Sequence, residues 1–247
     1  MINFHIITIF PDIFNSYLNE SIIGRAIKTK LLTVKFYNPR NYVKGNKSNY
    51  KPVDGKPYGG GAGMVLQAEP ILKAFSEVEK NIKLARRGGS KKKKIIILSA
   101  KGKFFNQKIA YDWARKYEEI VFITGRYEGI DERVKKALKA EEISIGPYVL
   151  TDGDVAAMVV FSAVARLIPG AIRLESLKEE SHWNLLLKKE KDGEAGENGL
   201  EHPHYTRPEV LKYISLGRGK ETKIYKVPKV LLSGNHKKID EWKKRKN

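Results

Sequence analysis

The strongest constraint on the fold is an alternation of two hydrophobic patterns along the first two-thirds of the chain. Short apolar runs, typical of strands buried on both faces, are separated by longer stretches in which apolar residues recur with a helical period. The expected strands are residues 4–10, 31–37, 95–98 and 120–124, and the expected helices are residues 67–84, 104–117, 131–138 and 155–168. Strands that alternate with helices indicate an α/β domain built on a mostly parallel sheet.

The last third of the chain has a different character. Pro169-Gly170 ends the last helical stretch, and the next thirty or so residues mix charges with glycines and show no sustained periodicity. We therefore expect three parts: a domain at residues 1–169, a flexible interdomain linker at 170–200 and a small, mainly helical domain at 201–247. Within the small domain we expect a helix that begins at Arg207-Pro208-Glu209, a strand at residues 230–232 and a final helix containing Trp242.

The charge of the chain favours a polyanionic partner. Lysine and arginine number 47 against 28 acids, a formal net charge of +19, which promotes nucleic-acid binding through counterion release. Solubility, or heavy use of lysine codons, would explain the total equally well. The distribution favours a binding role, because residues 80–116 hold thirteen lysines or arginines and one acid, Asp112. We hypothesise that residues 80–116 form part of an RNA-binding surface, a role that neutralising Lys91 to Lys94 would test.

Several classes of protein are excluded by what the chain lacks. Cysteine is absent and the five histidines show no metal-ligand spacing, so neither disulfides nor a zinc site are expected. No apolar stretch approaches the roughly 18 residues that span a bilayer, and the start does not resemble a secretory leader. We expect a cytoplasmic protein that does not contact membranes.

A glycine-rich segment follows the second expected strand. Residues 56–64 read Lys-Pro-Tyr-Gly-Gly-Gly-Ala-Gly-Met, and such glycines let backbone amides approach a ligand closely. The segment matches neither the P-loop nor the dinucleotide-binding fingerprint. Taken alone, it is more typical of a flexible turn than of a phosphate site.

Two further motifs lie where parallel α/β sheets bind ligands, at the carboxyl ends of strands. Residues 124–133 read Thr-Gly-Arg-Tyr-Glu-Gly-Ile-Asp-Glu-Arg, and either a ligand site or a helix cap on Asp131 explains their charges. Residues 144–154 read Ser-Ile-Gly-Pro-Tyr-Val-Leu-Thr-Asp-Gly-Asp, and they either bind an adenine edge through backbone groups or simply connect a strand to a helix. Arg166, near the end of that helix, either caps it or binds an anion.

The last two motifs contain side chains that can stack on or grip unpaired RNA bases. Residues 202–208 read His-Pro-His-Tyr-Thr-Arg-Pro, and residues 230–236 read Val-Leu-Leu-Ser-Gly-Asn-His. On composition alone, the first is a proline-bounded turn and the second a strand followed by a turn.

Taken together, in this order and spacing, the motifs resemble the TrmD family of bacterial tRNA (guanine-N1)-methyltransferases in the SPOUT superfamily. Ile9-Phe10-Pro11 and Gly24-Arg25-Ala26 extend the similarity over nearly the whole chain. The resemblance implies a SPOUT trefoil-knotted α/β domain that binds S-adenosylmethionine, a homodimer with sites at the interface and a C-terminal domain that binds tRNA, with no role for DNA. It also implies methyl transfer to N1 of the guanine on the 3′ side of the anticodon.

The resemblance carries site residues over to this chain. The three loops implied to bind S-adenosylmethionine match Leu98, Ser99, Gly102, Gly125, Tyr127, Glu128, Gly129, Ile145, Gly146, Pro147, Tyr148, Val149, Leu150 and Gly153. The positions implied to contact tRNA match Tyr58, Gly59, Gly60, Gly61, His204, Tyr205, Arg207, Asn235 and His236. A magnesium requirement is also implied, although no ligands can be named.

The implied chemistry needs two catalytic groups. Guanine N1 carries a proton, so methylation requires a general base at N1 and a cation near O6, where negative charge develops. The arginine of the family matches Arg166. The acid of its linker matches Glu180 in Glu179-Glu180-Ser181-His182, where glutamate replaces the usual aspartate and adds one methylene. A base on a mobile linker would couple tRNA binding to catalysis.

The sequence departs from the family pattern in a few places. Ser99-Ala100-Lys101-Gly102 differs from the usual cofactor loop, and extra polar residues near 188–198 and 215–225 predict two surface loops. The chain stops soon after Trp242, so we expect an abbreviated C-terminal domain. Two alternatives stay open: a non-catalytic RNA-binding protein on the same scaffold, and a SPOUT enzyme that methylates rRNA or a ribose. Cofactor binding, together with Arg166 and the acidic linker, would distinguish a methyltransferase from the first alternative, because a protein that only binds RNA needs none of them. The combined motifs favour tRNA over the second.

Overall fold

The computed structural model of the protein describes residues 1–44, 51–84, 92–178, 202–215 and 221–244. The chain divides into two compact units, residues 1–177 and residues 178–247. This boundary falls inside the predicted linker, residues 170–200. One short helix, α7 (Leu174–Lys178), lies in that predicted linker, and the remainder of it lies outside the described residues. Within the described ranges, no helix is both long and apolar enough to cross a membrane.

The first unit is built around a five-stranded sheet in the order β2-β1-β6-β5-β7. All four neighbouring pairs are parallel, which confirms the predicted sheet type. The strands are β1 (Ile2–Ile7), β2 (Leu32–Tyr37), β5 (Lys93–Phe104), β6 (Glu119–Ile123) and β7 (Glu141–Ser144). A small antiparallel pair, β3 (Asp54–Gly55) and β4 (Val65–Leu66), flanks the glycine-rich segment.

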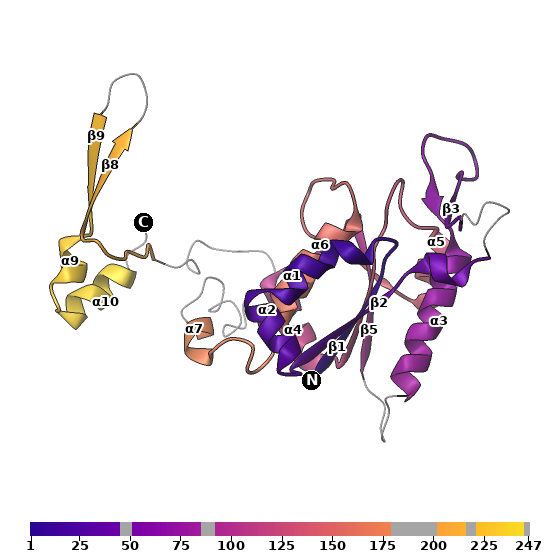
Figure 1. The fold of residues 1–247 in the computed structure, drawn as a ribbon, viewed down its shortest axis with the longest axis horizontal. Coiled ribbons are helices and arrows are strands. Elements are labelled where there is room, and N and C mark those ends of the chain that lie inside the picture. Colours follow the sequence, from indigo (N-terminus) through magenta and orange to yellow (C-terminus); the bar gives the residue numbers. More distant parts are fainter. Residues whose placement is uncertain (45–50, 85–91, 179–201, 216–220, 245–247) are drawn as a thin grey trace. The chain divides into compact units, whose positions relative to one another are not determined.

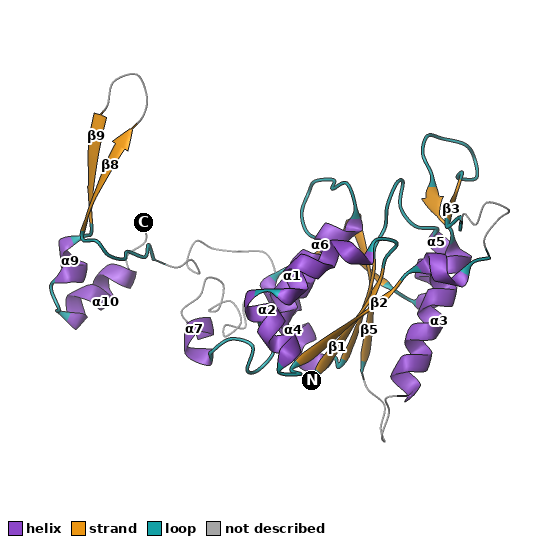
Figure 2. Ribbon diagram, in the orientation of Figure 1, coloured by secondary structure: helices purple, strands orange, loops and turns teal. Residues whose placement is uncertain are grey.

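Helices cover both faces of this sheet, so the unit is a three-layer α/β fold (Figures 1 and 2). One face carries α3 (Ala68–Leu84) and α5 (Glu132–Leu138). The opposite face carries α1 (Asn15–Asn19), α2 (Ser21–Lys28), α4 (Gln107–Lys116) and α6 (Gly153–Ala165). Short 3-10 turns at Pro11–Phe14 and Pro39–Tyr42 follow β1 and β2.

The core forms because the strands carry apolar residues on both faces. Phe4, Ile96, Ile120, Phe122 and Ile143 are fully buried, as expected for strands between two layers of helices. Each predicted strand and helix of this unit exists, with ends that shift by a few residues. The first strand is shorter than predicted because the chain turns at Pro11 into a 3-10 helix, and α1 and α2 were not predicted from the sequence.

The second unit corrects the prediction of a mainly helical domain. Its described residues form an antiparallel hairpin, β8 (Val210–Ser215) and β9 (Glu221–Lys226), followed by α9 (Lys229–Leu232) and α10 (His236–Lys244). The predicted helix start at residues 207–209 leads into β8, and the predicted strand at 230–232 is helix α9. In the predicted surface loop at 215–225, Ser215 ends β8 and residues 221–225 belong to β9, while residues 216–220 lie outside the described residues. Only the final helix around Trp242 is confirmed.

Candidate active site

A cavity of about 390 Å³ lies at the carboxyl ends of β5, β6 and β7. Three loops converge on it, as expected for ligand sites in parallel α/β sheets. Of the predicted cofactor residues, those that line the cavity are Leu98, Ser99, Gly125, Tyr127, Glu128, Gly129, Ile145, Gly146, Tyr148, Val149, Leu150 and Gly153. Gly102 and Pro147 are not part of its wall.

Gly102 lies outside the cavity wall but allows β5 to bulge toward the cavity and then return to the sheet. The pairing of β5 with β7 is interrupted between Leu98 and Lys103, so residues 99–102 leave the sheet and then return to it. A Cβ atom on Gly102 would lie 2.5 Å from the backbone nitrogen of Ile143. Only glycine allows the strand to return this closely.

A second close approach joins the loop after β6 to the first turn of α6. The backbone N–H of Gly153 donates to the carbonyl oxygen of Gly125 at 2.8 Å. A Cβ atom on Gly153 would lie 2.8 Å from the Gly125 nitrogen. Because neither backbone can move away without losing this hydrogen bond, the two loops are held as one wall of the cavity.

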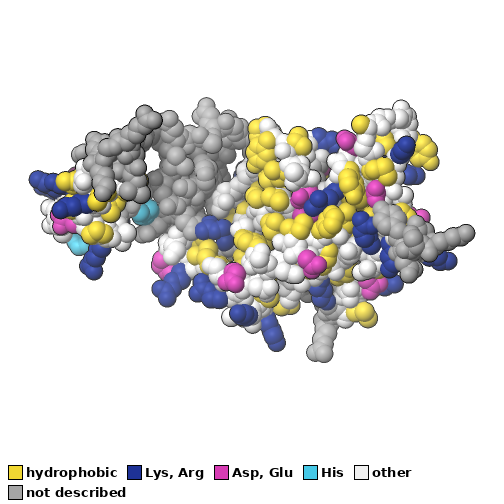
Figure 3. Space-filling model, turned by 45° about the horizontal axis from the view of Figure 1, so that its top comes forward, with side chains coloured by type: hydrophobic (Ala, Val, Ile, Leu, Met, Phe, Trp, Pro, Cys, Tyr) yellow, Lys and Arg dark blue, Asp and Glu magenta, His cyan; other side chains and the backbone are white. Residues whose placement is uncertain are grey.

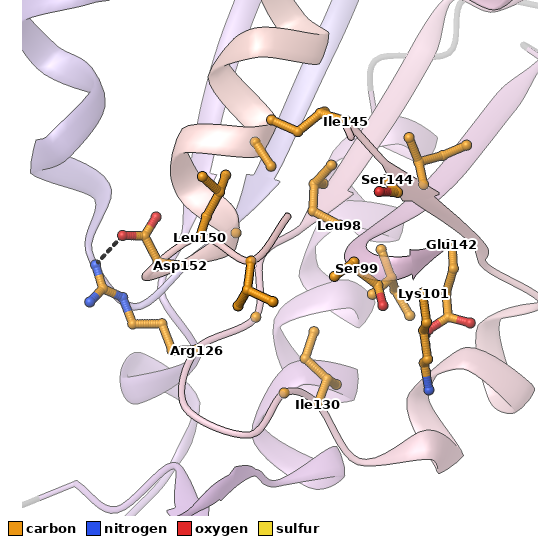
Figure 4. A pocket seen from close by; sticks show the side chains of 18 of the residues that line it. Leu98, Ser99, Lys101, Arg126, Ile130, Glu142, Ser144, Ile145, Leu150 and Asp152 are labelled. Atoms are coloured by element: carbon orange, nitrogen blue, oxygen red, sulfur yellow. Dashed lines mark hydrogen bonds and ion pairs between the residues drawn. The ribbon is translucent and has the colours of Figure 1, made fainter. Parts of the chain in front are cut away.

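The cavity is lined by apolar and charged side chains in separate places. Figure 4 shows Leu98, Ile130 and Ile145 around the cavity, with Arg126 and Asp152 joined at one edge and Lys101 and Glu142 at another. Lys101 Nζ lies 3.5 Å from Glu142 Oε1. An apolar pocket with a few charged groups at its rim is typical of a small-molecule site.

The charged group at the α6 edge extends into the core. Arg126 Nη2 contacts Asp152 Oδ2 at 3.3 Å, and Arg126 Nε lies 3.6 Å from Asp154 Oδ2. The Arg126 guanidinium carbon also lies 4.3 Å from the centre of the Phe10 ring. Asp154 is fully buried, and its Oδ1 accepts a hydrogen bond from Thr8 Oγ1 at 2.7 Å. This network fixes the position of the β6 loop relative to β1 and α6.

The environment of Asp154 shifts its protonation. Burial raises the pKa of its carboxyl, and hydrogen bonds from the Thr124 and Thr8 hydroxyls lower it, as does the nearby Arg126 charge. Burial is the larger effect, so the pKa lies above the ordinary value for aspartate. Asp152, by contrast, caps α6, since its Oδ1 accepts from the Asp154 and Val155 backbone N–H groups.

The glycine-rich segment docks directly on the wall of the cavity. The Glu128 N–H donates to the Met64 carbonyl at 3.0 Å, and the Leu66 N–H donates to the Gly129 carbonyl at 3.0 Å. Gly63 lies against Glu128, because a Cβ atom on Gly63 would be 2.5 Å from Glu128 Oε1. Two motifs more than sixty residues apart in sequence therefore meet at Glu128.

The tip of this segment is open. Tyr58 is fully exposed, and Cβ atoms on Gly59 and Gly60 would meet nothing within 4 Å. Gly61 is equally unhindered apart from the ring of Pro57 at 3.9 Å. The residues predicted to contact tRNA at this position thus form an accessible loop beside the cavity.

The motif after β6 has features of both interpretations left open by the sequence, a ligand site and a helix cap. Asp131 caps α5, since its Oδ1 accepts from the Arg133 N–H at 2.9 Å. It also lines the cavity. The Arg133 side chain holds the pKa of Asp131 below its usual range through their hydrogen bond.

The structure describes only one of the two predicted catalytic residues. Arg166 is half-buried at the C-terminal end of α6, where its N–H donates to the Ser162 carbonyl at 3.2 Å, and it does not line the cavity. Glu180 lies outside the described residues. The structure therefore does not place Arg166 in contact with the cavity, and the role of Glu180 stays a prediction.

The predicted tRNA contacts of the second unit are exposed. His204, Tyr205 and Arg207 are all accessible, and Tyr205 lies 6.2 Å from the Trp242 ring, centre to centre. Asn235 caps α10 through a hydrogen bond from the Lys238 N–H, and His236 is the first residue of that helix. Asn235 therefore has a structural role whether or not it contacts RNA.

Two lysines of the lysine-rich segment are held in ion pairs within the first unit. Lys93 Nζ pairs with Glu79 at 2.5 Å and lies over the Phe75 ring, while Lys94 pairs with Glu141 and lies over the Trp113 ring. Both side chains are largely buried. Lys92 is exposed, and Lys91 lies outside the described residues, so the hypothesis that the lysine-rich segment binds RNA stays a prediction.

Sequence reasoning assigned no role to Arg126, Asp152 or Asp154, although it quoted the motifs that contain them. A signal for their contact was present in the sequence, because Arg126 lies in one loop and the two aspartates lie in another, and both loops were predicted to follow strands of one sheet. For a metal ion, the described residues offer no group of three or more acidic or histidine side chains, so no step is assigned to magnesium.

Comparison with known proteins identifies the family of this chain. The chain matches the family described as tRNA (Guanine-1)-methyltransferase TrmD over residues 2–247. A tRNA (guanine-N(1)-)-methyltransferase of Carboxydothermus hydrogenoformans is 44% identical over 98% of this chain and 81% of its own length. The proteins of the same name from Clostridioides difficile and Buchnera aphidicola are 40% and 42% identical over 98% of this chain, and over 90% and 88% of their own lengths. The chain therefore belongs to the TrmD family of tRNA (guanine-1)-methyltransferases.

Proposed function

We propose that this protein transfers the methyl group of S-adenosylmethionine to N1 of the guanine on the 3′ side of the anticodon in tRNA. The observation that carries the proposal is the convergence of three loops on a cavity of about 390 Å³, with the glycine-rich segment docked on its wall. A volume in this range suits a ligand of the size of the cofactor. With a tRNA substrate, we place the reaction in the cytoplasm.

The wall of the cavity suits the chemistry of S-adenosylmethionine. Leu98, Ile130 and Leu150 offer an apolar surface to a nucleoside, and the glycines of the three loops let backbone groups approach its edge. The Glu128 carboxylate lines the same cavity and would attract the cationic end of the cofactor. When bound, the cofactor supplies an electrophilic methyl group. The trefoil knot and a magnesium requirement stay predictions of the family resemblance.

Two residues are proposed to activate the guanine. Loss of the N1 proton is assigned to the Glu180 carboxylate, and stabilisation of the charge that develops on O6 is assigned to the Arg166 guanidinium. Arg166 ends the helix whose first turn forms part of the cavity wall, so α6 links it rigidly to the site. The role of Glu180 rests on the resemblance and on the need for a base.

The proposed role of Arg166 has a kinetic signature. Arg166→Ala should lower kcat by about 100-fold or more, because a lost charge-stabilising donor costs this much, while cofactor affinity stays within about twofold. Arg166→Lys keeps the charge and should retain part of the rate. Single-turnover methyl transfer and calorimetric titration with S-adenosylhomocysteine measure the two effects separately. Unchanged turnover in Arg166→Ala would assign the cation to another residue.

A homodimer is proposed from the exposed face of α6. Val155 and Val159 lie one turn apart and are 40% and 46% exposed, although the helix is apolar on nearly all sides. A helix of this kind is normally buried. Tyr17 and Val149 extend the apolar surface, and Figure 3 shows hydrophobic side chains gathered across the middle of this unit. Because Val149 also lines the cavity, a second copy on this face would help to close the cofactor site.

Light scattering tests the dimer. Val159→Lys should convert it to a monomer at micromolar concentration and lower methyl transfer at least about tenfold, since burying an unpaired charge in an interface is costly. Leu84→Lys changes an 83% exposed residue at the end of α3 and serves as the control. A Val159→Lys variant that stays dimeric, or is fully active as a monomer, would contradict this interface.

The assignment of the cavity to the cofactor can be tested without turnover. Ser99→Trp places a large ring in the cavity and should weaken S-adenosylhomocysteine binding by more than about 100-fold. Ser76→Trp, on the exposed side of α3, adds the same ring elsewhere and should bind normally. Calorimetric titration of both variants measures the difference. Equal affinities would place the cofactor outside this cavity.

A further inference from the structure

The hairpin of the second unit is unusual in that it buries nothing among the described residues. Each described side chain of β8 and β9 is exposed, including four large ones, Tyr213, Ile214, Ile224 and Tyr225, at 53–56%. The two strands extend away from α9 and α10 (Figure 1). An isolated two-stranded hairpin is marginally stable in water, so apolar side chains on both of its faces indicate that something covers at least one of them.

The register of the hairpin separates the aromatic from the aliphatic side chains. Leu211 lies opposite Tyr225, and Tyr213 lies opposite Lys223. Directly opposed residues share a face and side chains alternate along a strand, so both tyrosines lie on one face with Lys223. The other face carries Ile214 and Ile224 instead. We call the first of these, made by Leu211, Tyr213, Lys223 and Tyr225, the aromatic face.

The charge of the hairpin selects the kind of partner. The two strands hold three lysines, Lys212, Lys223 and Lys226, and one acid, Glu221, at the far end of β9. In residues 202–215 and 221–244, nine lysines and arginines stand against four acids. A second copy of the chain would bring like charges together. By the register, Lys223 lies beside the tyrosines, and Lys212 and Lys226 lie on the opposite face. Tyrosine rings beside a lysine, on a hairpin with lysines on both faces, match a polyanion whose bases can stack on the rings.

We propose that the aromatic face of the β8–β9 hairpin binds tRNA by stacking Tyr213 and Tyr225 on unpaired bases, with Lys223 beside the phosphates. This inference rests on the proposed function, since it takes tRNA as the substrate. It adds a contact outside the predicted tRNA residues, which lie in the glycine-rich segment, in the segment before β8 and after α9. Stacking tolerates sequence, so the hairpin contributes affinity and not the choice of the methylated base.

Three double variants of the full chain test the proposal. Tyr213→Ala with Tyr225→Ala removes both rings and should raise the Kd for a tRNA transcript at least about tenfold, with kcat at saturating tRNA within about twofold of wild type. Tyr213→Phe with Tyr225→Phe keeps the rings and should bind like wild type. Ile214→Ala with Ile224→Ala removes side chains of matching exposure from the opposite face and should also bind like wild type.

The outcomes are separable from failure of the catalytic proposal. Fluorescence anisotropy gives Kd, radiolabelled methyl transfer gives KM and kcat, and circular dichroism checks folding. If wild type methylates tRNA but the alanine pair binds as tightly as wild type, the hairpin proposal is overturned and a protein partner becomes the occupant. Equal losses in the phenylalanine or isoleucine pairs would also overturn it. Ring-dependent binding by a protein that transfers no methyl group would support the hairpin and refute the catalysis.

Discussion

The two units of this protein differ in where their side chains lie. In residues 1–177 each strand of the main sheet carries buried residues, and the loops of the cavity are joined by backbone hydrogen bonds and glycine contacts. In the second unit, the described side chains of the hairpin are all exposed. The first unit therefore has a core of its own and a cavity wall held by contacts within the unit. The hairpin of the second unit has no comparable burial among its described residues.

The largest effect that this comparison predicts comes from the same substitution in the two sheets. Ile96→Ala in β5 leaves a cavity at a fully buried site and should cost about 2–5 kcal/mol of unfolding free energy. Ile224→Ala in β9 removes a 56% exposed side chain and should cost less than about 0.5 kcal/mol. Urea denaturation followed by circular dichroism measures both. Similar losses would show that the hairpin is buried in solution.

A second pair compares a contacted and an open glycine in one loop. Gly63 and Gly59 have nearly the same backbone angle, φ +81° and +82°, so alanine strains both by roughly 1 kcal/mol. Only at Gly63 would the new Cβ collide with Glu128. Gly63→Ala should therefore weaken S-adenosylhomocysteine binding about tenfold, while Gly59→Ala leaves it unchanged. If the two variants bind alike, Glu128 does not depend on this loop.

Asp154 makes the stability of the first unit depend on pH. Because burial raises its pKa in the folded state, folding favours the protonated carboxyl, and this contribution is lost as pH rises from about the ordinary aspartate value through the raised pKa. The stability of Asp154→Asn relative to wild type should therefore increase over that pH range. Thermal unfolding at a series of pH values follows the difference. A constant difference would mean that Arg126 fully compensates the buried charge.

The smallest predicted effect compares lysines of the two units. Lys94 is paired with Glu141, and Lys223 is exposed on the aromatic face of the hairpin. Lys223→Gln should reduce the slope of log Kd for tRNA against log salt by about 1, because it removes one phosphate contact, and Lys94→Gln should not change that slope. Filter binding over a range of salt concentrations provides both values. A larger change of slope for Lys94→Gln than for the hairpin variant would support the lysine-rich segment as an RNA surface.

The same contrast explains what could be predicted from the sequence. The strands and helices of the first unit are found because Ile96, Ile120 and Phe122 must be buried, and burial leaves a readable period. In the second unit, residues 210–215 and 230–232 were assigned the wrong type of element. Their side chains are not packed in a core of their own, so hydrophobic pattern carried little information about them.

The site was predicted in part for a related reason. The glycine motifs marked the loops that line the cavity, because the first turn of α6 passes so close to the loop after β6 that only glycine fits at Gly153. The ion pairs of Arg126 with Asp152 and Asp154 were missed because they join two loops whose separation only the folded sheet defines. The burial of Lys93 and Lys94 was missed for the same reason, since Glu79 and Glu141 come from other elements.

The measurement that tests the central claim most directly is transfer of a tritiated methyl group from S-adenosylmethionine to two tRNA transcripts. The transcripts differ only in carrying guanine or adenine immediately 3′ of the anticodon, and the product is identified by nucleoside analysis. The proposed function predicts label in the guanine transcript alone, recovered as 1-methylguanosine. Label in both transcripts, or in neither while tRNA is still bound, would contradict it, and the second result would favour a non-catalytic RNA-binding protein.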